Sequence, residues 1–324
     1  MNDKELLDKL NQLSKKYSTT GQDLNSYLDG LLYSDYIGYW DYIKLETLLS
    51  LQRPKTDFPD EKIFILYHQI TELYFKLCLL ELEQINKNGR NVLATGEDLG
   101  WHTTLTVDFF IERMKRLNRY LKNMIVSFEI MTQGMDKEEF LKFRMALLPS
   151  SGFQSVQYRM LEIRSTNLSQ LCHNIPKVRT IEKLYKNLYW KSGANELKTG
   201  QKTYTLKQFE KKYDERLLKL SNKMVEKNIW IKYQQLDKKD QENKVLKQLL
   251  KEYDSQLNIN WKLAHFKSAV KYLHQSDKNI AATGGTNWKK YLPPKFQKLI
   301  FFPNLWTDQE KDEWGKSWVE NINL

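Results

Sequence analysis

Helical periodicity runs through every long segment of this sequence, and few residues interrupt it. Apolar side chains recur three and four positions apart, and the 324 residues include only 13 glycines and 7 prolines. Alternating strand patterns are nearly absent. The sequence therefore predicts an all-α fold, with helices at about 3–16, 40–51, 60–86, 101–131, 136–148, 152–173, 179–189, 206–226, 238–274 and 293–300.

Composition places the chain among globular proteins. Hydrophobic residues make up 41% and aromatic residues 13% of the 38.8 kDa chain, enough to bury a large core. No repeat of fixed period occurs, which argues against a solenoid. We expect one helical domain over 1–324, in which the lysine-rich stretch 177–250 is an inserted helical subdomain.

The positive charge of the chain is dispersed. Lysine and arginine number 51 against 40 aspartates and glutamates, a formal charge of +11. Acidic residues alternate with the lysines, as on solvated helix faces. A helical nucleic-acid-binding protein stays an alternative, motivated by KNIWIKYQQLDKK at 227–239, although such proteins usually cluster their basic residues. We expect no nucleic-acid partner.

The sequence shows no sign of secretion or of a membrane span. Cys78 and Cys172 both lie in apolar helical patterns, so we expect buried free thiols in a reducing compartment. The first residues, MNDKELLDKL, lack a signal-peptide pattern, and no run approaches the ~18 apolar residues of a span. These features favour a cytoplasmic protein without a membrane partner.

An arginine within an apolar helical stripe suggests an anion-binding site. Phe140, Arg144, Leu147 and Ser151 follow helical spacing, just before and within a Pro-Ser-Ser-Gly break. A buried guanidinium keeps its charge and needs an anionic partner. That partner can be a ligand carboxylate or phosphate, or an internal Asp or Glu in a structural salt bridge.

Two of the five histidines lie in apolar helices. His68 follows Phe64 by one turn, and His265 follows Trp261 by one turn. Each by itself also fits a hydrogen-bonded core histidine. The chain has no C-x-x-C-H, C-x-x-C, H-E-x-x-H, G-x-G-x-x-G or Walker motif and no Glu-x-x-His pairs. A bound metal would then suit a haem iron held by one proximal histidine.

A glycine pair follows the second histidine. The string AATGGTNW at 281–288 can close over a small polar ligand through its amides and hydroxyls, or it can be a simple turn.

Together these segments resemble the tryptophan 2,3-dioxygenase family. They occur in the family's order and cover the body of the chain except about 177–250. The segments are YWDYIKLETLLSLQRP (39–54), IFILYHQITELYFKL (63–77), FLKFRMALLPSSGFQSVQYRMLE (140–162), NWKLAHFK (260–267), TGGT (283–286) and FFPNLW (301–306).

The resemblance implies haem b as the cofactor and assigns the residues around it. His265 takes the position of the proximal iron ligand, with Trp261 beside it, and His68 that of the distal, catalytic histidine facing the indole N–H. Ser151 falls where a hydroxyl lies near the haem edge. Thr283 matches the loop threonine near the substrate's ammonium and carboxylate groups.

The resemblance also implies a substrate pocket. Arg144 matches the clamp on the substrate carboxylate, and Phe64 and Leu147 match apolar walls. Phe140 stands where some members carry tyrosine, so it keeps the wall but loses a hydrogen bond. Three residues of the amino-terminal segment 1–59 match those inserted into a neighbouring subunit of the family's homotetramer: Tyr39, Tyr42 and Ile43.

The expected reaction is cleavage of the indole C2=C3 bond of L-tryptophan by O2. The product is N-formylkynurenine, in the first step of the kynurenine pathway of tryptophan catabolism. The alternative within the same superfamily is a haem enzyme that hydroxylates or oxygenates another aromatic substrate.

Overall fold

The computed structural model describes residues 2–21, 23–148, 150, 152–194, 201–275, 278–279 and 298–316. The chain divides into two compact units, Met1–Arg53 and Pro54–Leu324. The first unit contains the helices α1 (Asp3–Thr19), α2 (Leu24–Tyr33), α3 (Tyr39–Tyr42) and α4 (Leu45–Leu49).

The first unit has no buried residue among those described. Its helices are set by local signals: the side chain of Asp23 accepts hydrogen bonds from the amides of Asn25 and Ser26 and caps α2. The predicted helix 40–51 is wrong in one respect, because Lys44 adopts a left-handed conformation with φ of 55° and separates α3 from α4. Helix α2 was not predicted.

The second unit confirms the all-α prediction, since its few strands form only two short antiparallel ribbons among the described residues. In chain order its elements are α5 (Pro59–Asn86), β1 (Arg90–Val92), β2 (Asp98–Trp101), α6 (Val107–Ser127), α7 (Glu129–Gln133), α8 (Lys137–Phe143), η1 (Arg144–Leu147), η2 (Gly152–Gln154), α9 (Val156–Ser165), η3 (Leu168–Leu171), α10 (Ile181–Lys186), α11 (Tyr189–Gly193), α12 (Tyr204–Met224), α13 (Ile229–Gln234), α14 (Lys238–Gln241), α15 (Lys244–Ser255), η4 (Gln256–Asn260), α16 (Trp261–Leu273), β3 (His274–Gln275), β4 (Lys278–Asn279), η5 (Pro303–Leu305) and α18 (Asp308–Asp312).

Several predicted boundaries are wrong. The helix expected at 101–131 begins only at Val107, because a β-ribbon comes first and Thr106 caps α6. The segments 152–173 and 179–189 each break into shorter helices, and α13 and α18 were not predicted. Most of the predicted helix 293–300 lies outside the described residues.

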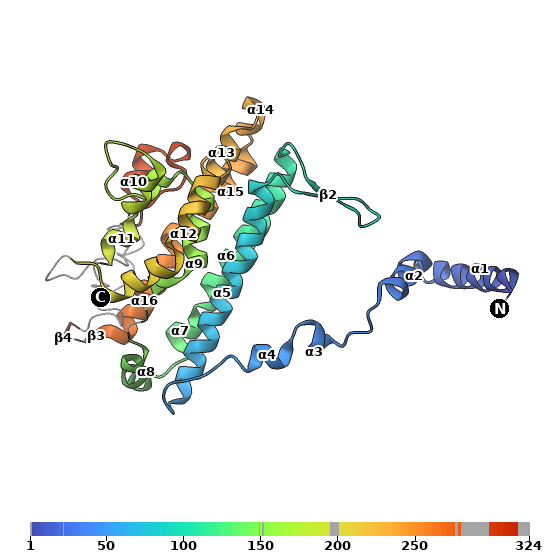
Figure 1. The fold of residues 1–324 in the computed structure, drawn as a ribbon, viewed down its shortest axis with the longest axis horizontal. Helices are drawn as coiled ribbons and strands as arrows, with labels where there is room; N and C mark the ends of the chain where they lie inside the picture. Colours follow the sequence, from blue (N-terminus) through green and yellow to red (C-terminus); the bar gives the residue numbers. More distant parts are fainter. Residues whose placement is uncertain are drawn as a thin grey trace. The chain divides into compact units, whose positions relative to one another are not determined.

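The long helices pack in adjoining layers. Helix α5 packs against α6 and α9, α6 packs against α15, and α12 packs against α9. Figure 1 shows α5, α6 and α12 running along nearly the same direction. Residues 177–250 hold α10 to α14 and the start of α15, and they belong to the second unit. The expectation that they are an insertion stays a prediction.

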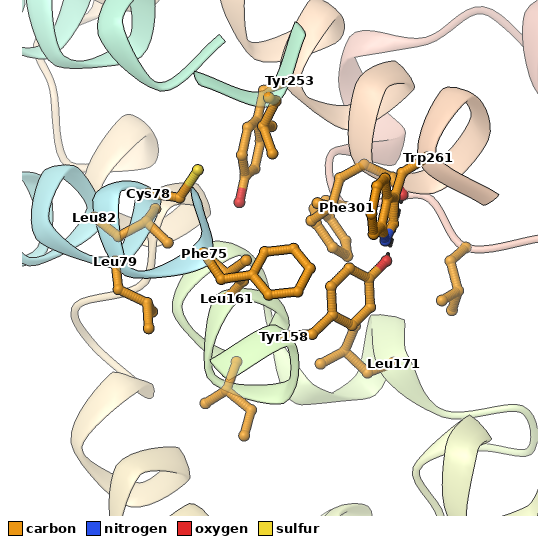
Figure 2. Close-up of a cluster of buried hydrophobic side chains, with 14 of the residues drawn as sticks. Phe75, Cys78, Leu79, Leu82, Tyr158, Leu161, Leu171, Tyr253, Trp261 and Phe301 are labelled. Carbon is orange, nitrogen blue, oxygen red and sulfur yellow. Dashed lines mark hydrogen bonds between the residues drawn. The ribbon is translucent and has the colours of Figure 1, made fainter. Parts of the chain in front are cut away.

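The core lies where α5, α9 and α16 meet. Figure 2 shows Phe75 of α5 pointing toward Tyr158 of α9 and Trp261 of α16. The ring centroid of Phe75 lies 5.4 Å from that of Tyr158 and 5.8 Å from that of Trp261. The buried side chains of Cys78 and Leu82 continue this face of α5. These contacts fix α16 against α5, and both helices carry a candidate histidine.

A π-helical turn interrupts the long helix that the sequence predicts over 238–274. The turn, η4, separates α15 from α16. Just before it, the fully buried Asp254 accepts hydrogen bonds from the amides of Phe301 and Phe302, from the Trp306 indole and from the Asn258 side chain. Burial nevertheless raises the pKa of Asp254 to about 6. Asp254 thus ties the segment 301–306 to the base of α16.

Thr166 makes a second attachment to this segment, and it provides a test of how firmly the segment is held. Its buried hydroxyl donates to the carbonyl of Phe301 at 2.6 Å. Thr166→Val keeps the shape but leaves that carbonyl unpaired, so the free energy of unfolding in urea should fall by about 1–2 kcal/mol. Thr104→Val, at an exposed position, is the control. If both variants lose the same free energy of unfolding, the hydrogen bond from Thr166 to Phe301 does not hold this segment.

Candidate active site

The two candidate histidines have the same local geometry. Nδ1 of His68 lies 2.7 Å from the carbonyl oxygen of Phe64, and Nδ1 of His265 lies 3.1 Å from that of Trp261. A carbonyl can only accept, so each Nδ1 carries the proton and each Nε2 carries a lone pair. The Trp261 carbonyl is therefore the partner of the second ring nitrogen of His265, a partner that the sequence did not reveal.

His265 is held neutral by its surroundings. It is half-buried in α16, with its ring 4.3 Å from that of Trp261 and 4.5 Å from that of Phe128. Burial, together with a smaller effect of charge on His68, lowers its pKa to about 4. The two imidazoles are therefore close enough to interact electrostatically, although 197 positions separate them in the sequence. A neutral imidazole with a free Nε2 lone pair is a metal ligand.

His68 is accessible to solvent and yet surrounded by protein. Its side chain is exposed, but the protein atoms around it still lower its pKa through desolvation. The ring of Phe64 lies 4.1 Å away on the same helix face. At neutral pH the Nε2 of His68 can accept a hydrogen bond from an N–H group.

An aromatic wall joins three helices beside His68. The ring of Phe64 in α5 lies 6.2 Å from Phe140 and 5.9 Å from Phe143, both in α8. Phe140 also lies 4.7 Å from Tyr272 in α16. The sequence predicted Phe64 and Phe140 but missed Phe143, Tyr272 and Phe128. The spacing of Phe143 three residues after Phe140 was the available signal for one of them.

Arg144 follows directly on this wall. The α-helix expected over 136–148 is wrong in its second half: α8 ends at Phe143, and Arg144–Leu147 form a 3₁₀ turn. The side chain of Arg144 is 5% exposed, and burial lowers its pKa from the ordinary value. A guanidinium still keeps its charge there. Leu147 is half-buried at the end of the same turn.

The roles of the remaining predicted site residues stay predictions. Ser151 and Thr283 lie outside the described residues. Tyr39 and Tyr42 are exposed in α3, and Ile43 follows them, half-buried, in the first unit.

A buried ionic cluster supports α16 from the side of α9. Arg159 donates to Glu162 at 2.8 Å and to the Tyr189 hydroxyl at 2.9 Å, while Tyr189 donates to Glu162 at 2.6 Å. Nζ of Lys262, in the first turn of α16, lies 5.4 Å from the Tyr189 ring centroid. Burial lowers the pKa of Lys262 to about 8. Arg159 and Lys262 fall in two of the sequence segments matched above.

Other site types find little support in the described part of the chain. No group of three or more His, Cys, Asp or Glu side chains there could hold a metal ion.

Both cysteines are free. Cys78 is buried as predicted, whereas Cys172 is only half-buried, which corrects the prediction for it. By length and composition alone α5 could cross a membrane, a criterion that core helices of water-soluble proteins also meet.

Comparison with known proteins identifies the family of the chain. A curated tryptophan 2,3-dioxygenase of Ruegeria sp. is 33% identical over 153 residues, which are 46% of this chain and 50% of that protein. Another, of Pseudomonas fluorescens, is 33% identical over 130 residues, 40% of this chain and 41% of that protein. The matches thus span about half the length of these curated relatives. The family model described as tryptophan 2,3-dioxygenase matches residues 29–282, so the chain belongs to the tryptophan 2,3-dioxygenase family.

Proposed function

We propose that this chain is a haem-dependent dioxygenase that cleaves the indole ring of L-tryptophan with O2 to give N-formylkynurenine. The observation that carries the proposal is the shared geometry of His68 and His265: each Nδ1–H donates to the carbonyl four residues earlier in its helix, which leaves the Nε2 lone pair of each imidazole available. Membership of the family supports the same reaction.

The donor set around His265 fits haem b. It offers one neutral imidazole, whose Nδ1–H is held by a carbonyl and whose Nε2 can bind iron. Phe128 and Trp261 supply aromatic surface beside it. When bound, the haem would supply the iron at which dioxygen reacts. The family resemblance adds Ser151 near the haem edge.

The chain's own residues would bind and orient the substrate. Arg144 would hold the carboxylate of L-tryptophan in a bidentate pair, with Thr283 near the ammonium group. Phe64, Phe140 and Leu147 would enclose the indole and keep water away from it. Nε2 of His68 would accept a hydrogen bond from the indole N–H and so set the ring's orientation.

An optical spectrum and a product assay test the proposal. Purified protein reconstituted with haem should show a Soret band that shifts with L-tryptophan, and it should form N-formylkynurenine when O2 is added. A hydroxylated product with the indole ring intact would show that the chain is the alternative haem oxygenase and not a ring-cleaving dioxygenase. Absence of haem binding would contradict both.

His68→Ala is expected to slow the reaction without removing haem. The loss of one hydrogen bond to the substrate should reduce kcat/KM about 10-fold, since such a bond contributes roughly 1–1.5 kcal/mol. The Soret band should persist. The exposed His173→Ala is the control. Loss of haem from the His68 variant would show that the roles of the two histidines are exchanged.

We also propose a cytoplasmic homotetramer in which residues 1–59 contact a neighbouring subunit. Supporting this, no described residue of the first unit is buried, although the unit carries many apolar and aromatic side chains, including Leu31, Leu32 and Tyr36. Such a segment gains stability only against another surface. Tyr39, Tyr42 and Ile43 would contact the neighbour's substrate site. A reducing cytoplasm suits the two free cysteines.

A further inference from the structure

Lys262 is a charged side chain in the core that the proposed mechanism does not use. It lies in the first turn of α16, three residues before His265, and it is only 8% exposed. Its Nζ makes no hydrogen bond to any described residue. A buried ammonium group without a hydrogen-bonding partner costs free energy, so its presence in the core requires a physical reason.

The contacts of Lys262 hold its ammonium group in place without neutralising it. Nζ lies 5.4 Å from the ring centroid of Tyr189, a cation–π contact that leaves the charge intact. Glu162 attracts the ammonium, but its carboxylate is already paired with Arg159 at 2.8 Å. Asp254 acts on Lys262 from the end of α15, and two amides, an indole and an amide side chain already bind its carboxylate.

The Lys262 amine is mainly protonated at pH 7. Burial lowers its pKa to about 8, and the charge of Arg159 acts in the same direction, while Glu162 and Asp254 oppose the change. Water and salt screen a buried charge far less than a charge on the surface. The ammonium group therefore acts on its surroundings over several ångströms.

Two effects of this charge reach the proposed iron ligand. Residues three apart lie on one face of a helix, about 4.5 Å apart along its axis, so Lys262 and His265 are neighbours on α16. Lys262 also follows Trp261 directly, and the carbonyl of that peptide accepts the hydrogen bond from Nδ1 of His265. A nearby positive charge makes the carbonyl a weaker acceptor and so makes the imidazole a less electron-rich ligand. Both effects favour the lower positive charge of ferrous iron.

We infer that Lys262 supplies the positive charge that favours the ferrous form of the bound haem, the form to which dioxygen binds. The inference rests on the proposed function and deepens it, because it concerns the haem that His265 would bind. Removal of this charge should stabilise the ferric form without removing haem from the protein.

Spectroelectrochemistry of the haem-reconstituted chain tests this role, because the electrode supplies the electron and the Soret band reports the ferrous fraction. Lys262→Met keeps the size of the side chain but removes its charge. It should lower the ratio of ferrous to ferric haem at a fixed potential about 10-fold, as expected for one buried charge within ~10 Å. Lys262→Arg should keep the wild-type ratio. Glu162→Gln removes a negative charge from the same cluster, so it should raise the ratio.

The matched control is Lys267→Met. Lys267 lies on the same helix, two residues after His265, but its side chain is exposed. Water screens its charge, so this variant should keep the wild-type ratio. Circular dichroism melting and the Soret intensity check that each variant is folded and contains haem.

Several results would overturn the role of Lys262. One is an equal ratio in the wild type and Lys262→Met. Another is a loss in Lys262→Arg or Lys267→Met as large as that in Lys262→Met, since a buried charge at this position would then not be the cause. If Lys262→Met does not fold, Glu162→Gln decides, and an unchanged or lower ratio there overturns the inference.

Failure of this role and failure of the proposed function give different results. A wild-type chain that binds no haem would contradict the proposed function, and this inference with it. A wild-type chain that binds haem and forms N-formylkynurenine, but whose ferrous fraction does not change in Lys262→Met, would overturn the role of Lys262 alone.

Discussion

His265→Ala is expected to abolish the Soret band when the purified protein is reconstituted with haem. The variant removes the neutral imidazole whose Nδ1–H the Trp261 carbonyl holds at 3.1 Å, and with it the Nε2 proposed as the iron ligand. His68 cannot replace it in the same role, because it lies on a different helix, α5. Optical titration with haem measures the loss.

Two controls separate ligand loss from unfolding. His102→Ala, at an exposed position, should keep the wild-type spectrum. Imidazole added to the folded His265→Ala variant should restore part of the Soret absorbance, because it can supply the missing nitrogen ligand. A spectrum of His265→Ala that equals that of the wild type would refute the ligand assignment, whatever the activity of the variant.

Arg144→Ala is expected to lower kcat/KM for L-tryptophan by about 30- to 1000-fold. The estimate corresponds to roughly 2–4 kcal/mol, the loss of a charge-assisted pair from a shielded site. The side chain is 5% exposed and follows Phe143, whose ring lies 5.9 Å from that of Phe64, so the pair would form away from bulk water. Steady-state kinetics measure the effect.

A substrate analogue without a carboxylate provides the control for Arg144→Ala. Tryptamine lacks the carboxylate, so Arg144→Ala should change its kcat/KM little. Arg144→Lys should fall between wild type and alanine, because an ammonium group cannot form the bidentate pair. Arg119→Ala, on an exposed position of α6, should have no effect. A loss below two-fold for L-tryptophan would mean that the clamp is another residue.

The elements that the sequence predicted well are those with a long, regular pattern. The predicted helix 60–86 is confirmed, since α5 spans Pro59–Asn86, and the predicted 206–226 matches α12 closely. Short elements were missed where a single residue or contact determines the local backbone conformation. Lys44 divides a predicted helix by its left-handed conformation, and η4 enters where Asp254 and Asn258 pair. Neither leaves a clear trace in a hydrophobic pattern.

The residues of the candidate site were likewise only partly predictable from the sequence. Residue type and spacing marked His68, His265 and Arg144 as unusual, and the family resemblance assigned their roles. They did not reveal Phe128, which lies 4.5 Å from the His265 ring. An aromatic residue near the end of an amphipathic helix looks the same whether it meets a histidine or an aliphatic core. Only the packing of neighbouring helices distinguishes these cases.

The sequence by itself determined that the chain is helical, which helix faces are apolar, and which few polar side chains interrupt them. The reason is that helix periodicity, capping and turn chemistry depend on neighbours within a few residues. The tertiary structure alone decided that Phe128 packs against the ring of His265, that Phe64 meets Phe140, and that Phe140 meets Tyr272. Those outcomes depend on side-chain packing between segments far apart in the chain, which no local pattern encodes.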